Sequence, residues 1–488
     1  MTLNRRQLTI ANLVYCYIPV FLFLGGWCRW LVSVPFCLLL LLAFYLIYRT
    51  ASKQEGPVET LTIEKKVVFP VMIISAILAV IIGYGGILID IDLFGDYVRN
   101  GAVVQDLARY PWPVIYTDAQ TPSMLTYYLG SYLFPGLVGK IFGSPIVGEL
   151  FMGVMGWIGM LLIFLNILFL TDAKTPKAQV WALLIYLGFY GMLIPLQLLT
   201  FWYNKDVILG YPHWFTYPYL QYRSTMVCLK WMWPQYTIPV LGIIGLYTHS
   251  EDRKIYALWI LPALICGVWA FVTLVAYAVC AYVVRCVQEK KMHWDIFSWQ
   301  NIVCALIGLI MLTYLLGCWS TDATGNMKFH LVTDWKYYLL SYWPFCLFMF
   351  GIYFMLIWKD TKKDNFFYIT LFLLCTIPFM HAGKFNDWVM GNSMPALFML
   401  TIYCIRFLIN PEIKAKVHKK WLALVICIAI NVPYPLFELY NFKYTGMPER
   451  SMKVFSCRDC EDIDLGWRTY FTNYDYEESF FYKYIARK

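Results

Sequence analysis

Charged residues are scarce in this chain. Asp, Glu, Lys and Arg make up 14% of its 488 residues and hydrophobic residues 60%, whereas a typical soluble domain carries about 25% charged residues. Such a composition excludes a soluble globular protein, a disordered chain and a small secreted domain held by disulfides. Apolar runs close to the ~20 residues of a membrane-spanning helix recur along almost the whole length, which predicts an all-α membrane protein with many crossings.

Several motifs of nucleotide-dependent proteins and metalloenzymes are missing. The sequence has no G-x-x-x-x-G-K-[ST], no G-x-G-x-x-G that opens a helix and no H-E-x-x-H, so nucleotide-driven pumping and nucleotide-sugar binding in a Rossmann domain are disfavoured. Charged residues are also rare within the apolar runs, which argues against an ion-coupled transporter. We interpret the net charge of +9 as loop charge that sets membrane orientation, and we expect no nucleic-acid partner.

The fifteen cysteines indicate little chemistry, because most lie in apolar runs, where a thiol acts as a small hydrophobe. Cys457 and Cys460 form the only C-x-x-C pair, and a second pair to complete a zinc site is missing. A local disulfide or two free thiols is expected there. Arg5 and Arg6 precede the first apolar run, which ends without the small-residue cleavage site of a signal peptide. We therefore expect a retained first helix.

The apolar runs predict about thirteen membrane helices. Two of them, near 235–269, are short enough to be bent or half-buried. The expected ranges are 10–26, 30–48, 67–89, 146–170, 178–200, 235–249, 255–269, 271–287, 299–318, 337–357, 365–381, 393–409 and 420–436.

The distribution of basic residues predicts the sides. One alternating set of short connections carries 21 of the 39 Lys and Arg residues, and the positive-inside rule assigns it to the cytoplasm. The N-terminus is then cytoplasmic and the C-terminal tail lies outside. The expected parts are two N-terminal helices with a cytoplasmic loop (1–66), a membrane core (67–436) with outer loops 90–145, 201–234, 319–336 and 382–392, and an outer tail (437–488).

Acidic residues cluster where the third expected helix leaves the membrane on the outer side. Asp90, Asp92 and Asp96 lie there, with Arg99 three residues further on, and Asp106 precedes a Pro-Trp-Pro turn in the same loop. Carboxylates at bilayer depth are costly and are usually paired, hydrated or functional. The plainer alternatives are a solvated helix end with an Asp96–Arg99 pair and, for Asp106, an anchor for the turn.

The second outer loop interleaves cations with aromatic residues. It contains Lys205, His213 and Arg223 and leads into the turn Pro234-Gln-Tyr236. Such a mixture suits sugar stacking and phosphate contact. It equally suits an interfacial aromatic belt, and a single His such as His213 is more often structural.

Two shorter features complete the outer side. The stretch from Ser123 to Phe134 has the pattern of an amphipathic helix lying in the membrane interface. The loop at 383–388 places Lys384 near Asp387, next to Asn386. The alternative for that loop is an ordinary helix N-terminus, where Asn or Asp caps free N–H groups.

In this order, these segments resemble the GT-C superfamily of integral membrane glycosyltransferases, which place an acidic motif and interfacial helices in the first large outer loop. More closely, residues 67–488 resemble a group of bacterial polytopic membrane proteins of that architecture. The matching stretches are Asp96-Tyr-Val-Arg99, Asp106-Leu, Pro111-Trp-Pro-Val114, Tyr127-Tyr-Leu, Leu137-Val-Gly-Lys140-Ile-Phe-Gly143, Pro234-Gln-Tyr236, Asn386-Asp-Trp-Val-Met-Gly-Asn-Ser-Met-Pro-Ala-Leu397 and Ser479-Phe-Phe-Tyr-Lys-Tyr.

The resemblance implies a GT-C-like bundle in a bacterial inner membrane and an inverting transfer outside it. The sugar would come from a polyprenyl-phosphate carrier lipid and pass to a glycan or lipid acceptor. Asp96 would be the base and Asp106 a second catalytic acid that orients Arg99 or the acceptor. A divalent metal is compatible with the acid cluster but is not implied, and neither is another cofactor. Residues implied to bind donor phosphate or substrate are Arg99, Lys205, Arg223, Tyr236, Lys384 and Asp387.

The chain departs from the group at two positions. Tyr236 stands where a His is expected, and Gly391 where an Arg is expected. If those residues bind donor phosphate, this chain uses other cations or another donor. Three alternatives therefore stay open: a glycan polymerase or ligase on the same scaffold, a lipid or glycan transporter, and a non-catalytic membrane subunit.

Overall fold

A computed structural model gives the fold. It describes residues 2–53, 59–83, 96–117, 122–203, 220–319, 329–383, 386–440, 456–457 and 472–488.

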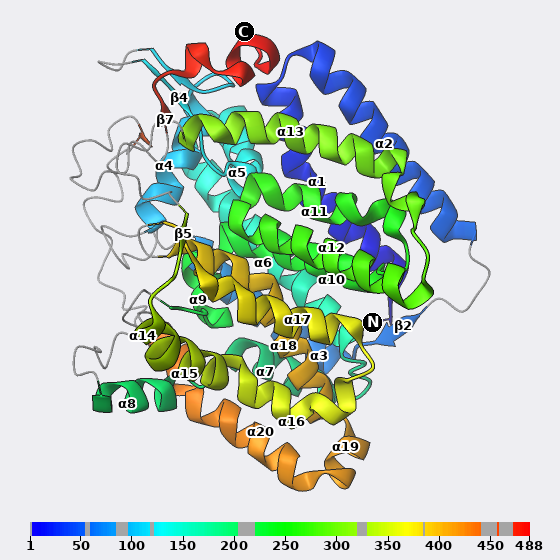
Figure 1. Ribbon diagram of the computed structural model, residues 1–488. Coiled ribbons are helices and arrows are strands. Elements are labelled where there is room, and N and C mark those ends of the chain that lie inside the picture. The colour runs from blue at the N-terminus through cyan, green and yellow to red at the C-terminus, as the bar shows by residue number, and fades with distance from the viewer. Residues whose placement is uncertain are drawn as a thin grey trace.

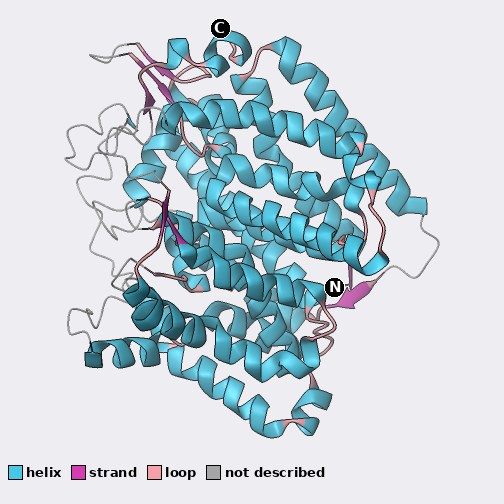
Figure 2. Ribbon diagram, viewed as in Figure 1, coloured by secondary structure: helices cyan, strands magenta, loops and turns pink. Residues whose placement is uncertain are grey.

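Helices make up most of the described chain (Figure 2). The α-helix satisfies every backbone N–H and C=O within one segment, as a membrane span requires. The helices of the first half are α1 (Arg5–Trp27), α2 (Trp30–Lys53), α3 (Lys65–Gly83), α4 (Asp96–Arg109), α5 (Gly130–Ile141), α6 (Pro145–Leu170), α7 (Pro176–Gly188), α8 (Leu193–Tyr203), α9 (Thr225–Trp231) and α10 (Trp233–Thr248). Those of the second half are α11 (Tyr256–Cys266), α12 (Val268–Glu289), α13 (Trp299–Trp319), α14 (Trp335–Tyr337), α15 (Trp343–Cys346), α16 (Ile352–Thr361), α17 (Asn365–Thr376), α18 (Asp387–Ile409), α19 (Pro411–Lys416), α20 (His418–Asn431) and α21 (Pro433–Tyr440).

Nine helical stretches of the described residues are long and apolar enough to cross a membrane. The expectation of an all-α integral membrane protein is confirmed at this level, and the count of thirteen crossings stays a prediction. The nine are Arg5–Trp27, Trp30–Arg49, Pro145–Leu170, Pro176–Trp202, Val268–Glu289, Trp299–Gly317, Trp335–Thr361, Asp387–Ile409 and His418–Leu436.

The core of the bundle lies around α18 and α6. The apolar stretch of α18 is 83% buried and that of α6 72%, against 17% for α2, which lies at the edge (Figure 1). Asn12 of α1 and Asn166 of α6 exchange two side-chain hydrogen bonds of 3.1 Å inside this core. Such an amide pair holds membrane helices together, because the hydrophobic effect does little to drive helices together within a bilayer.

Two apolar runs that the sequence suggests as single helices are interrupted. Residues 178–200 divide into α7 and α8, because the chain leaves the helix so that the Met192 N–H can donate to the Phe348 carbonyl at 3.0 Å. A Cβ on Gly191 would lie 2.7 Å from the Met349 carbonyl oxygen, so this approach needs glycine. Residues 335–361 contain two π-helical turns on either side of α15, which includes Pro344.

The strands are short. They are β1 (Thr2–Asn4), β2 (Thr60–Thr62), β3 (Ile115–Tyr116), β4 (Ser123–Leu125), β5 (His330–Leu331), β6 (Met380–His381) and β7 (Thr472–Asn473). The pair β1–β2 ties the N-terminus to the loop before α3, and β5 pairs with β6.

Strands β3, β4 and β7, in this order, form a small antiparallel sheet at one end of the bundle. The interfacial helix expected from Ser123 to Phe134 is therefore wrong in its first half. Ser123–Leu125 pairs on both sides, which fixes it as the central strand, and the helix begins only at Gly130.

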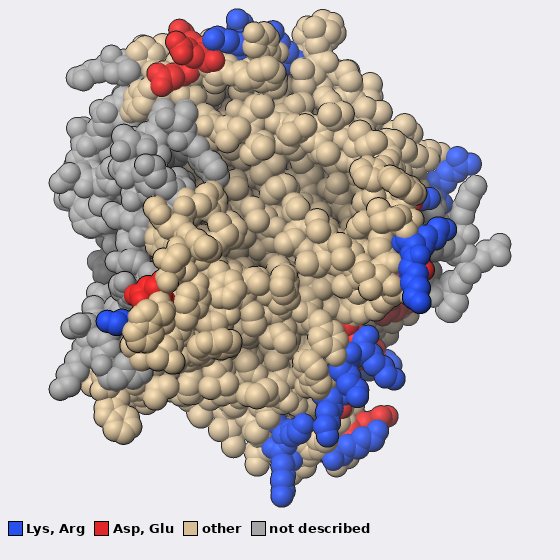
Figure 3. Space-filling view, in the orientation of Figure 1, with Lys and Arg blue, Asp and Glu red and all other residues tan. Residues whose placement is uncertain are grey.

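The two ends of the bundle differ in charge. The turns around 171–177, 250–254, 285–298, 359–364 and 406–420 meet at one end, called here the basic end. Arg285 pairs there with Glu251, Gln288 exchanges hydrogen bonds with Asn365, and Arg253 pairs with Asp295. In the space-filling view, Lys and Arg side chains gather along the right and lower-right edge, beside a broad uncharged surface (Figure 3). The sheet β3–β4–β7, α4, and the first turn of α18 lie toward the other end (Figure 1).

Candidate functional site

The predicted base, Asp96, is the first residue of α4. The free N–H groups of a helix start favour a carboxylate there. The side chains of Asp96 and Arg99 lie outside the described residues, as do Lys205 and Lys384. The roles of these four residues stay predictions.

Asp106, the second predicted acid, also lies on α4 and points into the protein interior. Its side chain is completely buried. Its Oδ2 accepts hydrogen bonds from the Tyr116 hydroxyl at 2.6 Å and from the Cys457 backbone N–H at 2.8 Å. Asp106 therefore ties α4 to β3 and to the C-terminal tail.

This environment changes the acidity of Asp106. Burial raises the pKa of its carboxyl above the ordinary value, and hydrogen bonds from Tyr116, Ser456 and Cys457 offset part of that rise. An acid enclosed in this way fits a positioning residue, which holds α4 and thereby Asp96, better than a group that touches a substrate.

Helix α5 connects α4 to the turn that contains Tyr236. The Tyr132 hydroxyl donates to Asn100 Oδ1 of α4 at 2.6 Å, and the Ser131 hydroxyl donates to the Pro234 carbonyl at 2.5 Å. A Cβ on Gly136 would lie 2.4 Å from the Leu107 Cβ, so α5 and α4 pack with their backbones close together. The first outer segment and the Pro234 turn are thus one assembly.

Arg223 and Tyr236, two of the predicted phosphate-binding residues, line the same small cavity of about 10 Å³. The Tyr236 hydroxyl lies 3.1 Å from the Tyr186 hydroxyl and shares a hydrogen bond with it. Arg223 Nε donates to the Met390 sulfur at 2.6 Å. The other lining residues are Tyr222, Met349 and residues of the break after α7, of α9 and of α18.

The first turn of α18 brings the third predicted loop to this place. Asn386 caps the helix in a left-handed conformation (φ 56°), and its side chain accepts from the Val389 N–H at 3.4 Å, as the alternative interpretation of this loop expected. Asp387 follows the cap, one turn before Met390. Arg223 thus contacts α18 one turn after Asp387.

The two departures from the family pattern have a structural context. A Cβ on Gly391 would lie 2.5 Å from the Trp269 Cβ, so the backbone of α18 packs directly on α12 and leaves no room for an Arg. Tyr236 is buried and occupied by its contact with Tyr186. Among the positions compared, Arg223 is the described cation that remains available for an anion.

The acid cluster and the C-x-x-C pair lie largely outside the described part of the chain. Within it, no group of three or more His, Cys, Asp or Glu side chains is placed to hold a metal ion. Cys457 is buried, and because Cys460 lies outside the described residues, the expectation of a disulfide or two thiols stays a prediction. Asp90, Asp92, His213 and Cys460 lie outside the described residues.

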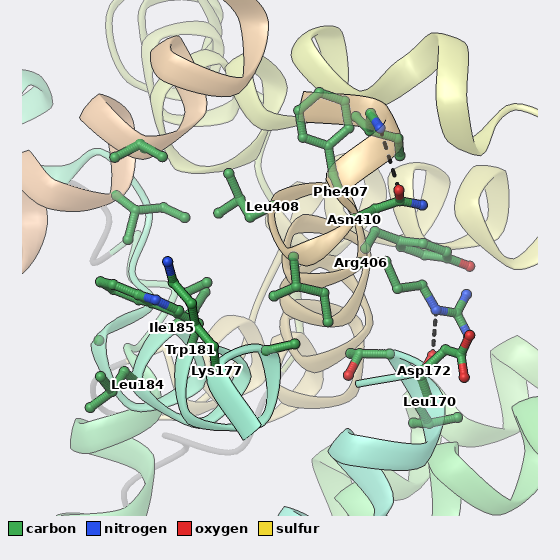
Figure 4. A pocket seen from close by; sticks show the side chains of 18 of the residues that line it. Leu170, Asp172, Lys177, Trp181, Leu184, Ile185, Arg406, Phe407, Leu408 and Asn410 are labelled. Carbon is green, nitrogen blue, oxygen red and sulfur yellow. Dashed lines mark hydrogen bonds between the residues drawn. The ribbon is translucent and has the colours of Figure 1, made fainter. Parts of the chain in front are cut away.

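A large cavity of the described chain lies at the basic end, and sequence reasoning did not find it. It encloses about 1740 Å³ between α3, α7, the end of α18, and α20. Lys177, Trp181 and Ile185 enter it from α7, and Arg406 and Leu408 from α18 (Figure 4). The Lys-x-x-x-Trp spacing of Lys177 and Trp181 is its only sequence signal, because a cavity wall and a lipid-facing wall have the same hydropathy.

Comparison with protein-family models, with curated proteins and with solved structures finds no match to this chain.

Proposed function

We propose that this chain is an inverting membrane glycosyltransferase that transfers a sugar from a polyprenyl-phosphate-linked donor to a glycan or lipid acceptor. One observation carries the proposal: the segments that resemble the GT-C superfamily meet in the described structure. Tyr132 and Ser131 join α4 to the Pro234 turn, and Arg223 joins the second outer loop to α18. The tail reaches the same assembly at Cys457.

The reaction needs a base near the acceptor hydroxyl and cations near the departing phosphate. Asp96 accepts the hydroxyl proton while the hydroxyl oxygen attacks the anomeric carbon. The bond from that carbon to the phosphate oxygen breaks on the opposite side, which inverts the centre and releases the polyprenyl phosphate. Arg99, Lys205 and Lys384 would add positive charge, and Asp387 would hold one of these cations in place.

Arg223 is the best-supported phosphate ligand. Its side chain is half-buried, and within the described residues its guanidinium has a thioether sulfur as hydrogen-bond partner and no carboxylate. A cation withdrawn from water is stabilised by a counter-charge. The planar fork of Arg matches two phosphate oxygens. An anionic lipid headgroup would complete this site once the cavity beside Arg223, now the size of one water, opens.

The proposal places the reaction outside the cytoplasmic membrane. The basic end would face the cytoplasm by the positive-inside rule. Arg223 lies at the turn of α18 that contains Met390, and Arg406 near its other end. The step of sixteen residues from Met390 to Arg406 along α18 spans about 24 Å at 1.5 Å per residue. Arg223 and the basic end therefore lie near opposite membrane surfaces.

The proposal is tested by glycan mass spectrometry on cells that lack the protein and carry a variant. Arg223→Met keeps the apolar stem and should lower the transferred product at least about tenfold, the scale of one lost charged hydrogen bond. The amount of product from Arg223→Lys should lie between those from the native protein and from Arg223→Met. The control Arg49→Met removes an exposed Arg at the end of α2 and should be silent. Full product from Arg223→Met, at equal protein level, would contradict the assignment.

A further inference from the structure

Two helix faces form the long walls of the large cavity, and α3 and the end of α18 complete its lining. On α7, Lys177, Trp181, Ile185 and Gly188 line it at helical spacing, together with Leu184. On the facing wall, Trp421, Val425, Ile428 and Val432 do the same along α20 and just beyond it. Each wall is apolar over its length and carries its polar residues only at the basic end.

The cavity has its charged lining, called here its mouth, at the basic end and narrows between α7 and the residues after α20. The two walls approach each other at Gly188, whose Cβ position lies 3.8 Å from Val432 Cγ2. From Lys177 to Gly188 is eleven residues, or about 16 Å at 1.5 Å per residue. The hydrocarbon core of a bilayer is about 30 Å thick. The α7 wall of the cavity is therefore about as long as one leaflet is thick.

Its size and surface fit a lipid. The volume of about 1740 Å³ exceeds the roughly 300–1,000 Å³ of ordinary small-molecule sites. Trp181 and Leu184 are 52% and 51% exposed although they lie on an inner wall. Acyl chains would cover this apolar surface, whereas a small polar solute would leave most of it open.

Most charges at the mouth are already paired within the protein. Arg5 pairs with Glu59 and Lys174 with Asp172. Arg406 donates to the Leu170 carbonyl at 2.5 Å and to the Tyr247 hydroxyl at 2.7 Å, and lies 4.0 Å from Asp364.

Lys177 and Lys414 are different. Neither has a carboxylate partner within the described residues, and Lys414 Nζ lies 4.4 Å from the centre of the Trp421 ring. Figure 4 shows Lys177 on the same face of α7 as Trp181, above the apolar wall. A Lys beside a Trp is typical of headgroup depth, where the stem lies along apolar surface and the amine in water. Lys363 also lines the mouth without a carboxylate partner among the described residues, so three lysines face the two acids Asp360 and Glu412. One positive charge is left for an additional anion.

We infer that this cavity binds one anionic phospholipid from the leaflet at the basic end. Its phosphate lies at Lys177 and Lys414, and its chains fill the space between α7 and α20. The site is separate from the proposed transferase site, which lies near the other end of α18, so either assignment can fail without the other.

Photo-crosslinking in vesicles tests the inference. The purified chain is placed in phosphatidylcholine vesicles that contain phosphatidylglycerol with a diazirine in its acyl chain, and crosslinked peptides are mapped. Label is expected on α7 and α20 well above that on the lipid-facing side of α13. The same diazirine on phosphatidylcholine should label α7 and α20 much less.

Two pairs of variants make the result decisive. Lys177→Glu should lower cavity labelling about five- to tenfold, whereas Lys291→Glu, an exposed residue of another basic turn, should not. Leu184→Trp should narrow the cavity between α7 and α20 and lower labelling, whereas Leu306→Trp on the exposed face of α13 should not. Equal labelling by the two lipids, an equal effect of Lys291→Glu, or no effect of Leu184→Trp would overturn the inference.

Discussion

Asp106 is a completely buried carboxylate with donors on its Oδ2 from Tyr116 and Cys457. Asp106→Ala removes the acceptor and leaves those donors without a partner, which should cost about 1–3 kcal/mol of unfolding free energy. Asp106→Asn keeps an oxygen in place and should cost less. Thermal unfolding of the purified variants in one detergent measures this, and an equal loss in both would contradict the hydrogen-bond account.

The raised pKa of Asp106 predicts a dependence of stability on pH. Such a carboxyl adds fully to the free energy of unfolding at pH values below its unfolded-state pKa. This contribution is lost as the pH rises through the folded-state pKa. Asn does not titrate. The stability of the native chain relative to Asp106→Asn should therefore fall as pH rises above 3.8, the ordinary value. A difference that stays constant with pH would contradict the raised pKa.

Gly391 is a second residue whose environment allows a direct test. Gly391→Ala places a Cβ 2.5 Å from the Trp269 Cβ, and such overpacking should cost about 1–3 kcal/mol. Gly25 of α1 has nothing within 4 Å of its Cβ position, so Gly25→Ala should be neutral or slightly stabilising. Unfolding midpoints of the two variants in the same detergent decide the comparison.

At the scale of elements, the C-terminal segment is held at the turn between α1 and α2. Arg29 donates from Nε to the Ala486 carbonyl at 2.9 Å and from Nη2 to the Lys483 carbonyl at 2.6 Å, and Phe481 packs on Phe23 and Tyr314. Arg29→Ala should loosen this segment.

Trypsin should then cleave after Lys483 several times faster than in the native chain. Lys291→Ala, which removes an exposed charge at the basic end, serves as the control for general destabilisation. An unchanged cleavage rate in Arg29→Ala would show that the aromatic contacts of Phe481 and the backbone hydrogen bonds of Ile485 and Arg487 hold the segment without the Arg29 side chain.

Hydropathy predicts helices that are apolar over their whole length. It fails where a residue distant in sequence determines the local secondary structure. The ranges near α6, α12 and α13 are close to the expected ones, because a membrane helix satisfies its own backbone. Ser123–Leu125 becomes a strand because Thr472–Asn473 pairs with it. The break after α7 depends on the Phe348 carbonyl. Neither partner is visible in the local sequence.

At the scale of the whole molecule, the uneven charge predicts orientation. Lys291 lies in an exposed turn of the basic end, and Glu478 is exposed in the C-terminal segment. With the N-terminus in the cytoplasm, Glu478→Cys should react with a membrane-impermeant maleimide in intact cells, whereas Lys291→Cys should react only after lysis. The native chain gives the background of its own thiols, and the reverse pattern would contradict the orientation.

The site was predictable only in part. Tyr236 and Arg223 could be selected by motif order and do line one cavity. The burial of Asp106 could not be foreseen, because it depends on Tyr116 and on a tail residue 351 positions later. The large cavity at the basic end could not be predicted for a different reason, because its walls have the same hydropathy as any membrane helix.

The central claim is that this chain transfers a sugar with Asp96 as base. Its most direct test is mass spectrometry of the lipid-linked and surface glycans from cells with the native protein, cells without it, and cells with Asp96→Asn at equal protein level. The account predicts that one sugar residue is lost from the same glycan in both the deletion and the Asp96→Asn cells. Unchanged glycans in the deletion cells would contradict the transferase, and a change in the deletion alone would contradict the base.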